Sequence, residues 1–323
     1  MPMSRDRQSR SITDPADAGA AGLLSRRHGG AGALLVLGAA LLWATAGLAG
    51  AIAHQRSGLP ALAIGFWRLA VGAVATLPLL RGRTAAIGSD RAHLVGVGVG
   101  LATYQACYFA AVTLAGVSLA TLVTLGVAPL LIAAGGRLVL RERPQRATAV
   151  ALVAALGGLV LLVGAPTAGN AGAALPAAGL ACASAAGYAA VTVLTRQRRG
   201  GGAVSAFTAA ALGVAAVAAL PGALATGHWL PRDAVTLLLL AYLGAGPTAL
   251  AYLAYFRGLA TVTATTAGVL TLLEPAGATL LAVVLLGERL GARGVAGAML
   301  LTGTALALTL VQARGARRHA AAR

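Results

Sequence analysis

Charged residues are scarce in this chain, and lysine is absent. Only 10% of the 323 residues are charged, whereas soluble globular domains carry roughly 25%. A water-soluble fold could not cover its surface with so few charges. All 25 basic residues are Arg, against 8 acids, and they lie between long apolar runs instead of forming a patch with interleaved aromatic residues. This distribution argues against a nucleic-acid partner and indicates the charge bias of a membrane protein.

Residues that build catalytic or metal sites are sparse as well. The two cysteines, Cys107 and Cys182, lie inside apolar runs with no second thiol or histidine at metal-ligand spacing. The five histidines fall in tails or near the ends of apolar runs, and the chain contains neither a Walker loop nor an HExxH motif. We therefore expect no metal, no cofactor and no enzymatic activity. A membrane-embedded enzyme or a channel without a recognisable motif is the alternative function.

Long apolar runs dominate what is present. The chain is 58% hydrophobic, with a mean hydropathy of +0.83. About 20 apolar residues in a helix cross the roughly 30 Å hydrocarbon core of a bilayer. This length predicts an all-α integral membrane protein with ten transmembrane helices. We expect them near 31–53, 60–80, 92–114, 117–136, 147–164, 175–195, 203–225, 234–256, 259–286 and 294–313.

No charge separates the third and fourth runs. Together they would make one helix of about 45 residues, which is far too long for a bilayer. We therefore expect a tight turn near Ala115 and Gly116.

The arginines alternate between the two sides of these spans. With the amino terminus inside, 20 arginines fall in inside segments and four in outside segments, and Arg68 is left within a span. Segments on the cytoplasmic side of a membrane carry such an excess. We expect a multi-pass protein of the plasma (inner) membrane with both termini cytoplasmic.

Two segments of the chain match each other. "TLVTLGVAPLLIAAGGRLVLRERP" at 121–144 corresponds to "AGVLTLLEPAGATLLAVVLLGERL" at 267–290. Each copy then contains five spans, and an odd number places the second copy upside down in the membrane. The sequence thus predicts two inverted-topology five-helix repeats. The matching pairs, all 146 residues apart, are Pro129 and Pro275, Glu142 and Glu288, and Gly157 and Gly303.

These features occur in a fixed order in each half: a helix with an internal Pro, an apolar stretch, a Glu-Arg pair and a Gly-containing last helix. In this order the chain resembles the drug/metabolite transporter (DMT) superfamily, in its ten-span form with two EamA domains. The resemblance covers residues 31–313. It implies a secondary active transporter that exports small metabolites such as amino acids or drugs by alternating access. The implied organisation is a cytoplasmic tail (1–28), two EamA-like repeats (31–164 and 175–313) and a basic cytoplasmic tail (314–323).

Glu274 is the one acid placed near the middle of a span, the ninth. Desolvation there disfavours the charged form of a carboxyl group, which suits proton binding and release. Pro275 lacks an N–H, which leaves the carbonyl of Thr271 without its helical donor. Thr266 lies on the same helical face as Glu274. The competing interpretation is that Glu274 stays protonated and bonds to a neighbouring helix.

Two prolines and one arginine inside the predicted spans are further candidates for functional residues. Pro129 and Pro275 are expected to break their helices. Arg68, roughly 12 Å from the outer end of its span, could hold a substrate carboxylate or neutralise Glu274. It could equally be structural, packing with Trp67 or lying at a helix end.

Aromatic residues are only 4% of the chain, so their positions within the spans carry information. Deep aromatic residues could line one central cavity that binds a small-molecule substrate. Membrane-interface anchoring is the commoner reason for Tyr and Trp in such proteins. Glu142 and Glu288, beside arginines at helix ends, indicate interfacial ion pairs that fix turn geometry. The cavity candidates are Trp43, Tyr104, Tyr108, Tyr188, Tyr252 and Tyr255.

Overall fold

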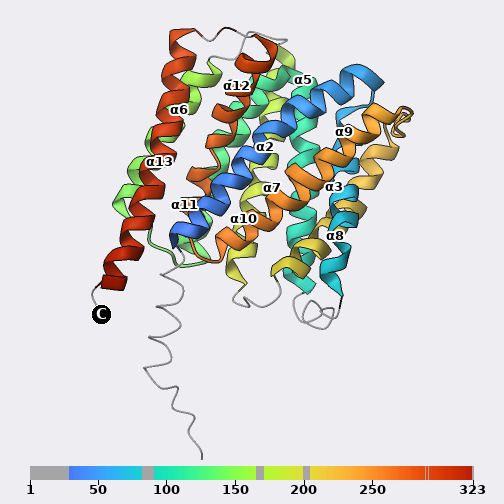
Figure 1. The fold of residues 1–323 in the computed structure, drawn as a ribbon. Helices are drawn as coiled ribbons and strands as arrows, with labels where there is room; N and C mark the ends of the chain where they lie inside the picture. Colours follow the sequence, from blue (N-terminus) through green and yellow to red (C-terminus); the bar gives the residue numbers. More distant parts are fainter. Residues whose placement is uncertain are drawn as a thin grey trace, which may run out of the picture.

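The computed structural model describes residues 29–81, 91–164, 171–198, 204–287, 289 and 291–321. The predicted tail 1–28 and Glu288 lie outside these residues. Every regular element within the described ranges is helical (Figure 1). The first half of the chain forms α2 (Gly29–Ser57), α3 (Ala61–Thr76), η1 (Leu77–Leu80), α5 (Arg91–Leu138) and α6 (Arg146–Val163). The second half forms α7 (Ala171–Gln197), α8 (Val204–Leu224), α9 (Ala234–Gly244), η3 (Ala245–Leu250), α10 (Ala251–Leu259), α11 (Ala264–Leu270), α12 (Leu273–Leu286) and α13 (Ala292–Ala321).

Helix α5 turns back on itself at Gly116. The described part of the chain has nine helices long and apolar enough to cross a membrane, and α5, with 48 residues, is one of them. Gly116 has φ 82° and ψ 169°, which is not helical. The hydroxyls of Tyr108 and Thr121 lie 2.9 Å apart across the turn. The helix is therefore a hairpin of two spans, which gives ten crossings and confirms the predicted fold class.

Two predicted boundaries differ from the structure. The ninth span was expected from residue 259, but α10 continues to Leu259 and α11 begins at Ala264. The reason is a helix cap, because the Thr263 hydroxyl accepts a hydrogen bond from the N–H of Thr266 at 3.2 Å. Helix α13 also continues beyond the predicted end of the last span at residue 313, as far as Ala321.

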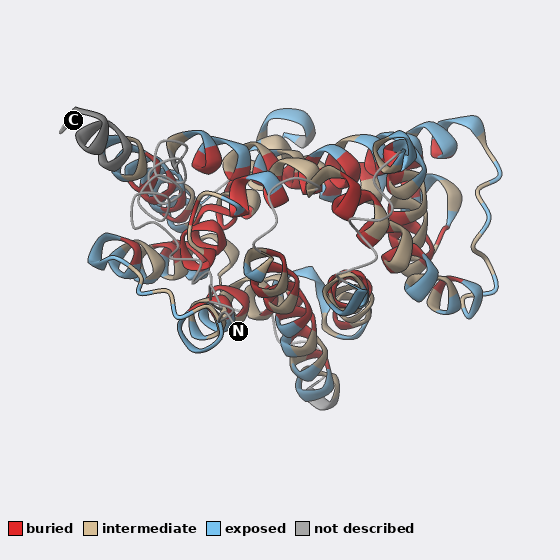
Figure 2. Cartoon of the chain, turned by 90° about the horizontal axis from the view of Figure 1, so that it is seen from below, coloured by how far each residue is buried: buried red, intermediate tan, exposed pale blue. Residues whose placement is uncertain are grey.

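Small residues pack the helices closely, while larger apolar residues face outward. Viewed along the bundle, buried positions lie towards its interior and exposed positions on its periphery (Figure 2). Leucine and valine side chains such as Leu238 and Val153 are exposed there, as expected for surfaces that contact lipid. Alanine fills much of the interior, which lets neighbouring helices approach each other.

The two repeats are interleaved instead of lying side by side as separate units. The α5 hairpin of the first repeat packs on α7 of the second, and α6 packs on α13 (Figure 1). At the first contact, a Cβ atom on Gly187 would lie 2.8 Å from the carbonyl oxygen of Gly100. At the second, a Cβ on Gly158 would lie 3.1 Å from the carbonyl oxygen of Gly297. Larger residues at these positions would force the repeats apart.

Candidate functional site

Buried aromatic side chains from both repeats meet in the middle of the bundle. Trp43 of α2 contacts Tyr188 of α7, with ring centroids 6.2 Å apart. Its centroid lies 5.2 Å from those of both Tyr252 and Tyr255 of α10. Tyr104 of α5 extends the group, 5.3 Å from Tyr188. We call these five residues the aromatic cluster; they are the deep positions that the sequence analysis selected, with Tyr108 left out.

Two polar atoms in the aromatic cluster have no hydrogen-bond partner. They are the indole nitrogen Nε1 of Trp43 and the hydroxyl oxygen of Tyr188, both fully shielded from solvent. The Tyr188 hydroxyl faces Thr271 and Tyr255, but no hydrogen bond of ordinary geometry forms. Buried polar atoms almost always have partners in folded proteins. Two exceptions in one cluster indicate a place where a ligand supplies the missing groups.

Glu274 lies at the start of a half-helix beside this cluster. Helices α11 and α12 are separated by Thr271 and Leu272, and Glu274 is in the first turn of α12. The positive end of the helix dipole favours an anion at this position. Glu274 is half-buried, and within the described part of the chain its carboxylate has neither a hydrogen bond nor an ion pair. It is free to bind an incoming group.

The carbonyl of Thr271 is not free, contrary to expectation. It accepts a hydrogen bond from the backbone N–H of Glu274 at 3.0 Å, because the chain tightens into a short turn before Pro275 instead of leaving the acceptor open. The Thr271 hydroxyl donates to the carbonyl of Gly268 at 3.0 Å. Pro275 itself follows the helix interruption by three residues, consistent with the expected break.

Arg68 reaches the same region from α3. Its Nε donates to the hydroxyl of Thr248 at 3.1 Å, and that hydroxyl donates to the carbonyl of Leu243 at 2.8 Å. Arg68 acts electrostatically on Glu274, yet the described side chains form no ion pair between the two within 4.0 Å. An arginine from the first repeat and an acidic residue from the second therefore lie beside the cluster without direct contact between them.

Thr248 and Pro247 were missed by the sequence analysis. They lie in η3, a single π-helical segment that interrupts the eighth span. Pro247 cannot donate to the carbonyl of Leu243, and the Thr248 hydroxyl takes that place. The signal was available in the sequence, as a Pro-Thr pair deep inside an apolar run.

Three further predicted site residues have partners or a backbone setting that the sequence did not predict. The hydroxyl of Tyr108 is bonded to Thr121 inside the hairpin, and its ring contacts Phe109. Thr266 lies at the start of α11, where its hydroxyl accepts from Thr263 at 2.8 Å. Pro129 does not break its helix, because α5 is helical on both sides of it and membrane helices accommodate proline through neighbouring groups.

Each end of the bundle is bridged by polar contacts between the repeats. At one end, Glu142 accepts from Nε of Arg196 at 2.9 Å and from the backbone N–H of Ala264 at 2.9 Å. This pairing joins the two repeats, whereas the sequence analysis expected Glu142 to pair with adjacent arginines. We call these contacts the Glu142 clasp.

The opposite end carries a second set of contacts. Nε of Arg56 lies 3.3 Å from Oδ1 of Asp233. The indole Nε1 of Trp67 donates a hydrogen bond to the carbonyl of Trp229 at 2.7 Å. Thr236, whose backbone N–H donates to the carboxylate at 3.0 Å, and then Arg56 hold the pKa of the Asp233 carboxyl below its usual range. Among the described residues, no group of three His, Cys, Asp or Glu side chains could hold a metal ion.

Known proteins are similar to this chain in sequence and in architecture. The model of the EamA-like transporter family matches residues 30–164 and again 175–310. "Uncharacterized transporter YwfM" of Bacillus subtilis (strain 168) is 31% identical over 264 residues, which is 80% of this chain and 86% of that protein. A solved crystal structure has a TM-score of 0.71 and 25% identity, covering 88% of this chain and 98% of the other.

The matches cover both halves of the chain, in agreement with the two repeats. The chain is thus a multi-pass membrane transporter of a small-molecule substrate, and it belongs to the EamA-like transporter family.

Proposed function

We propose that this transporter is a secondary active exporter of small metabolites, such as amino acids or drugs, and that it works by alternating access in the plasma membrane. The observation that carries the proposal is the uncompensated pair of Arg68 and Glu274 beside the aromatic cluster. The two charges come from different repeats, so a substrate held between them is held by both moving parts.

The chemistry of the site favours a zwitterion with an apolar or aromatic body. A guanidinium binds a carboxylate through two parallel hydrogen bonds, and Arg68 uses only its Nε in the described contacts. The free carboxylate of Glu274 matches an ammonium group. The aromatic rings offer an apolar surface, and the unpartnered atoms of Trp43 and Tyr188 offer polar contacts. Amino acids and amphiphilic drugs have this combination of groups.

Alternating access requires that the two ends of the bundle open in turn. The contacts available for this are the Glu142 clasp at one end and the pairs Arg56–Asp233 and Trp67–Trp229 at the other. Each set joins one repeat to the other, so breaking one set while keeping the other exposes the centre to one side of the membrane.

We further propose that Glu274 binds and releases the driving proton. Substrate and proton then compete for one carboxylate, which couples their movements in opposite directions. The test is transport of amino acids by the purified protein in proteoliposomes under an imposed pH gradient. We expect Glu274→Gln to remove the dependence of flux on the gradient, because an amide cannot exchange a proton at this position.

Asp90→Asn is the control, since Asp90 is an acid that the sequence places between the second and third predicted spans. It should keep gradient-driven flux. If Glu274→Gln transports with an unchanged response to the gradient, the proton role of Glu274 is wrong. If no amino acid or drug in a panel is moved by the wild type, the proposed substrate class is wrong.

A further inference from the structure

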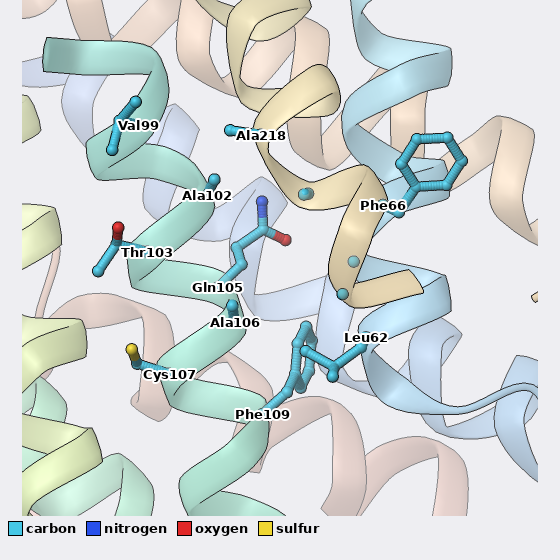
Figure 3. A pocket seen from close by; sticks show the side chains of 13 residues that line it. Leu62, Phe66, Val99, Ala102, Thr103, Gln105, Ala106, Cys107, Phe109 and Ala218 are labelled. Carbon is cyan, nitrogen blue, oxygen red and sulfur yellow. The ribbon is translucent and has the colours of Figure 1, made fainter. Parts of the chain in front are cut away.

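A second pocket lies away from the aromatic cluster, among α3, the first half of α5 and α8. Its volume is about 280 Å³, at the lower end of the range for small-molecule sites. Figure 3 shows it from close by, with Phe66 and Leu62 contributed by α3 and Phe109 and Ala218 contributed by α5 and α8. None of its thirteen lining residues is charged.

One polar side chain reaches into this pocket and has no partner. Gln105 is 5% exposed, and both Oε1 and Nε2 of its amide are buried without a hydrogen bond. In Figure 3 the amide projects from α5 towards the helix that carries Ala218. Burial of an amide in apolar surroundings without partners is strongly unfavourable unless a bound molecule satisfies its hydrogen bonds.

The packing around Gln105 keeps the space open. A Cβ atom on Gly65 would lie 3.8 Å from Oε1 of Gln105 and 3.2 Å from the Phe109 ring, so any larger residue there would fill the region beside the amide. Val99, 45% exposed, and Ala218 form an exposed apolar rim. Exposed apolar residues in the middle of a span face lipid, which gives a membrane-dissolved molecule a way in.

We propose that this pocket binds a neutral, ring-sized aromatic molecule with one hydrogen-bonding group, which enters from the lipid phase. The amide of Gln105 bonds to the polar group, and Phe66 and Phe109 contact the ring. The absence of charge from the lining residues excludes the zwitterion proposed for the central site, because an unpaired charge would be buried at high cost. The two sites are therefore chemically distinct, and this one does not depend on the proposed function.

The test uses 5-fluoroindole as the probe and the full chain in lipid nanodiscs. Binding is followed by the fluorine NMR signal, and empty nanodiscs are subtracted to remove partitioning into lipid. We expect saturable binding to the wild type. Gln105→Leu keeps the size of the side chain and removes the amide, and it should weaken binding about tenfold. Its thermal unfolding midpoint should stay equal or rise, because an unsatisfied buried amide is removed.

Two substitutions on α8 provide the matched pair. Ala218→Phe places a ring in the pocket and should abolish saturable binding, whereas Val217→Phe, on a neighbouring residue that is 73% exposed and outside the pocket, should not change it. Equal signals from all variants, or binding that never saturates, would overturn the proposal. So would saturable binding that only Trp43→Leu removes, because the probe would then occupy the central site.

Discussion

Arg68 is fixed by a single hydrogen bond, from its Nε to the hydroxyl of Thr248 at 3.1 Å. Both terminal amino groups of the guanidinium remain available for a substrate carboxylate. We predict that Arg68→Gln raises the substrate KM for transport by tenfold or more, the size expected for a lost charge-assisted pair. Membrane abundance should stay close to that of the wild type.

The matched control for this measurement is Arg257→Gln. Arg257 also donates to a single hydroxyl, that of Ser205 at 2.7 Å, but it is exposed and both residues belong to the second repeat. Its KM should not change. A collapse in the abundance of Arg68→Gln in immunoblots of membranes, with transport per molecule unchanged, would assign Arg68 a structural role.

At this scale the sequence predicted which side chains are central but not how they are partnered. Residues of unusual polarity or size in an apolar run stand out individually, and Glu274, Arg68 and Trp43 were found that way. Thr248 was missed because a threonine in a span usually bonds to its own helix. Its role depends on a hydrogen bond with Arg68, which is 180 residues away in the sequence. A local sequence pattern cannot predict a contact over that separation. The partner of Thr266 was not predicted either, because its hydroxyl accepts a hydrogen bond from the Thr263 hydroxyl, which caps the start of α11.

Among the helices, the α5 hairpin depends on one backbone conformation. Gly116 has φ 82° and ψ 169°, a region of φ and ψ that is essentially restricted to glycine. We predict that Gly116→Ala lowers the free energy of unfolding by about 1–3 kcal/mol. The measurement is the thermal unfolding midpoint of purified protein in detergent.

Gly126→Ala is the control on the same helix. A Cβ there would lie 3.9 Å from Leu159, an ordinary contact, and Gly126 is helical. It should leave the midpoint unchanged or raise it slightly, since alanine favours helix. If both variants melt like the wild type, the turn at residue 116 does not constrain the hairpin.

The Glu142 clasp joins α7 and α11 to the loop after α5. Glu142 accepts two hydrogen bonds from the second repeat. We predict that Glu142→Gln and Arg196→Gln each destabilise the protein by about 1–3 kcal/mol, with a coupling energy between them of at least 0.5 kcal/mol. A double-mutant cycle of thermal unfolding measures both quantities.

Arg141→Gln and Arg143→Gln serve as controls, because both arginines are exposed next to Glu142. The position of Glu142 in the sequence predicts these neighbours as its partners. A larger coupling energy of Glu142 with Arg143 than with Arg196 would mean that Glu142 pairs with its sequence neighbour and does not join the two repeats.

The element boundaries show where sequence patterns were sufficient. Apolar length predicted most of the described spans within a few residues, because the thickness of the bilayer fixes the length of helix that crosses it; the start of the ninth span and the end of α13 are the exceptions. Proline was a poorer guide. Pro275 follows an interruption, Pro129 lies inside a continuous helix, and Pro247 lies in a π-helical segment that was not predicted. The outcome depends on which neighbouring groups take over the freed carbonyl, and those groups come from the tertiary structure.

For the whole molecule, the arginine alternation predicts that both chain ends lie in the cytoplasm. A green fluorescent protein fused after residue 323 should fluoresce in a bacterial host, whereas alkaline phosphatase at the same position should be inactive. Phosphatase inserted after Gly227, in the connection between α8 and α9, should be active. Active phosphatase at the carboxyl terminus would invert the assigned orientation.

The constant offset of 146 residues predicted that the chain consists of two repeats, but it did not predict which helices of one repeat pack against which helices of the other. The ungapped match identifies which helices are equivalent, whereas contacts such as α5 with α7 and α6 with α13 depend on complementary shapes formed by small residues. Alanine and glycine are too frequent in this sequence for their positions to indicate particular contacts. Only the folded chain shows which glycines meet a neighbouring backbone.

The single-residue turn at Gly116 also limits how the transporter can move. A connection of one residue allows the two arms of the hairpin to change their angle but not to slide along each other. The first arm carries Tyr104 and Gln105, on the central site and on the second pocket, and the second arm ends near the Glu142 clasp. Under the proposed alternating access, a rotation about Gly116 that opens the Glu142 clasp would therefore also tilt the walls of the proposed central site and of the second pocket.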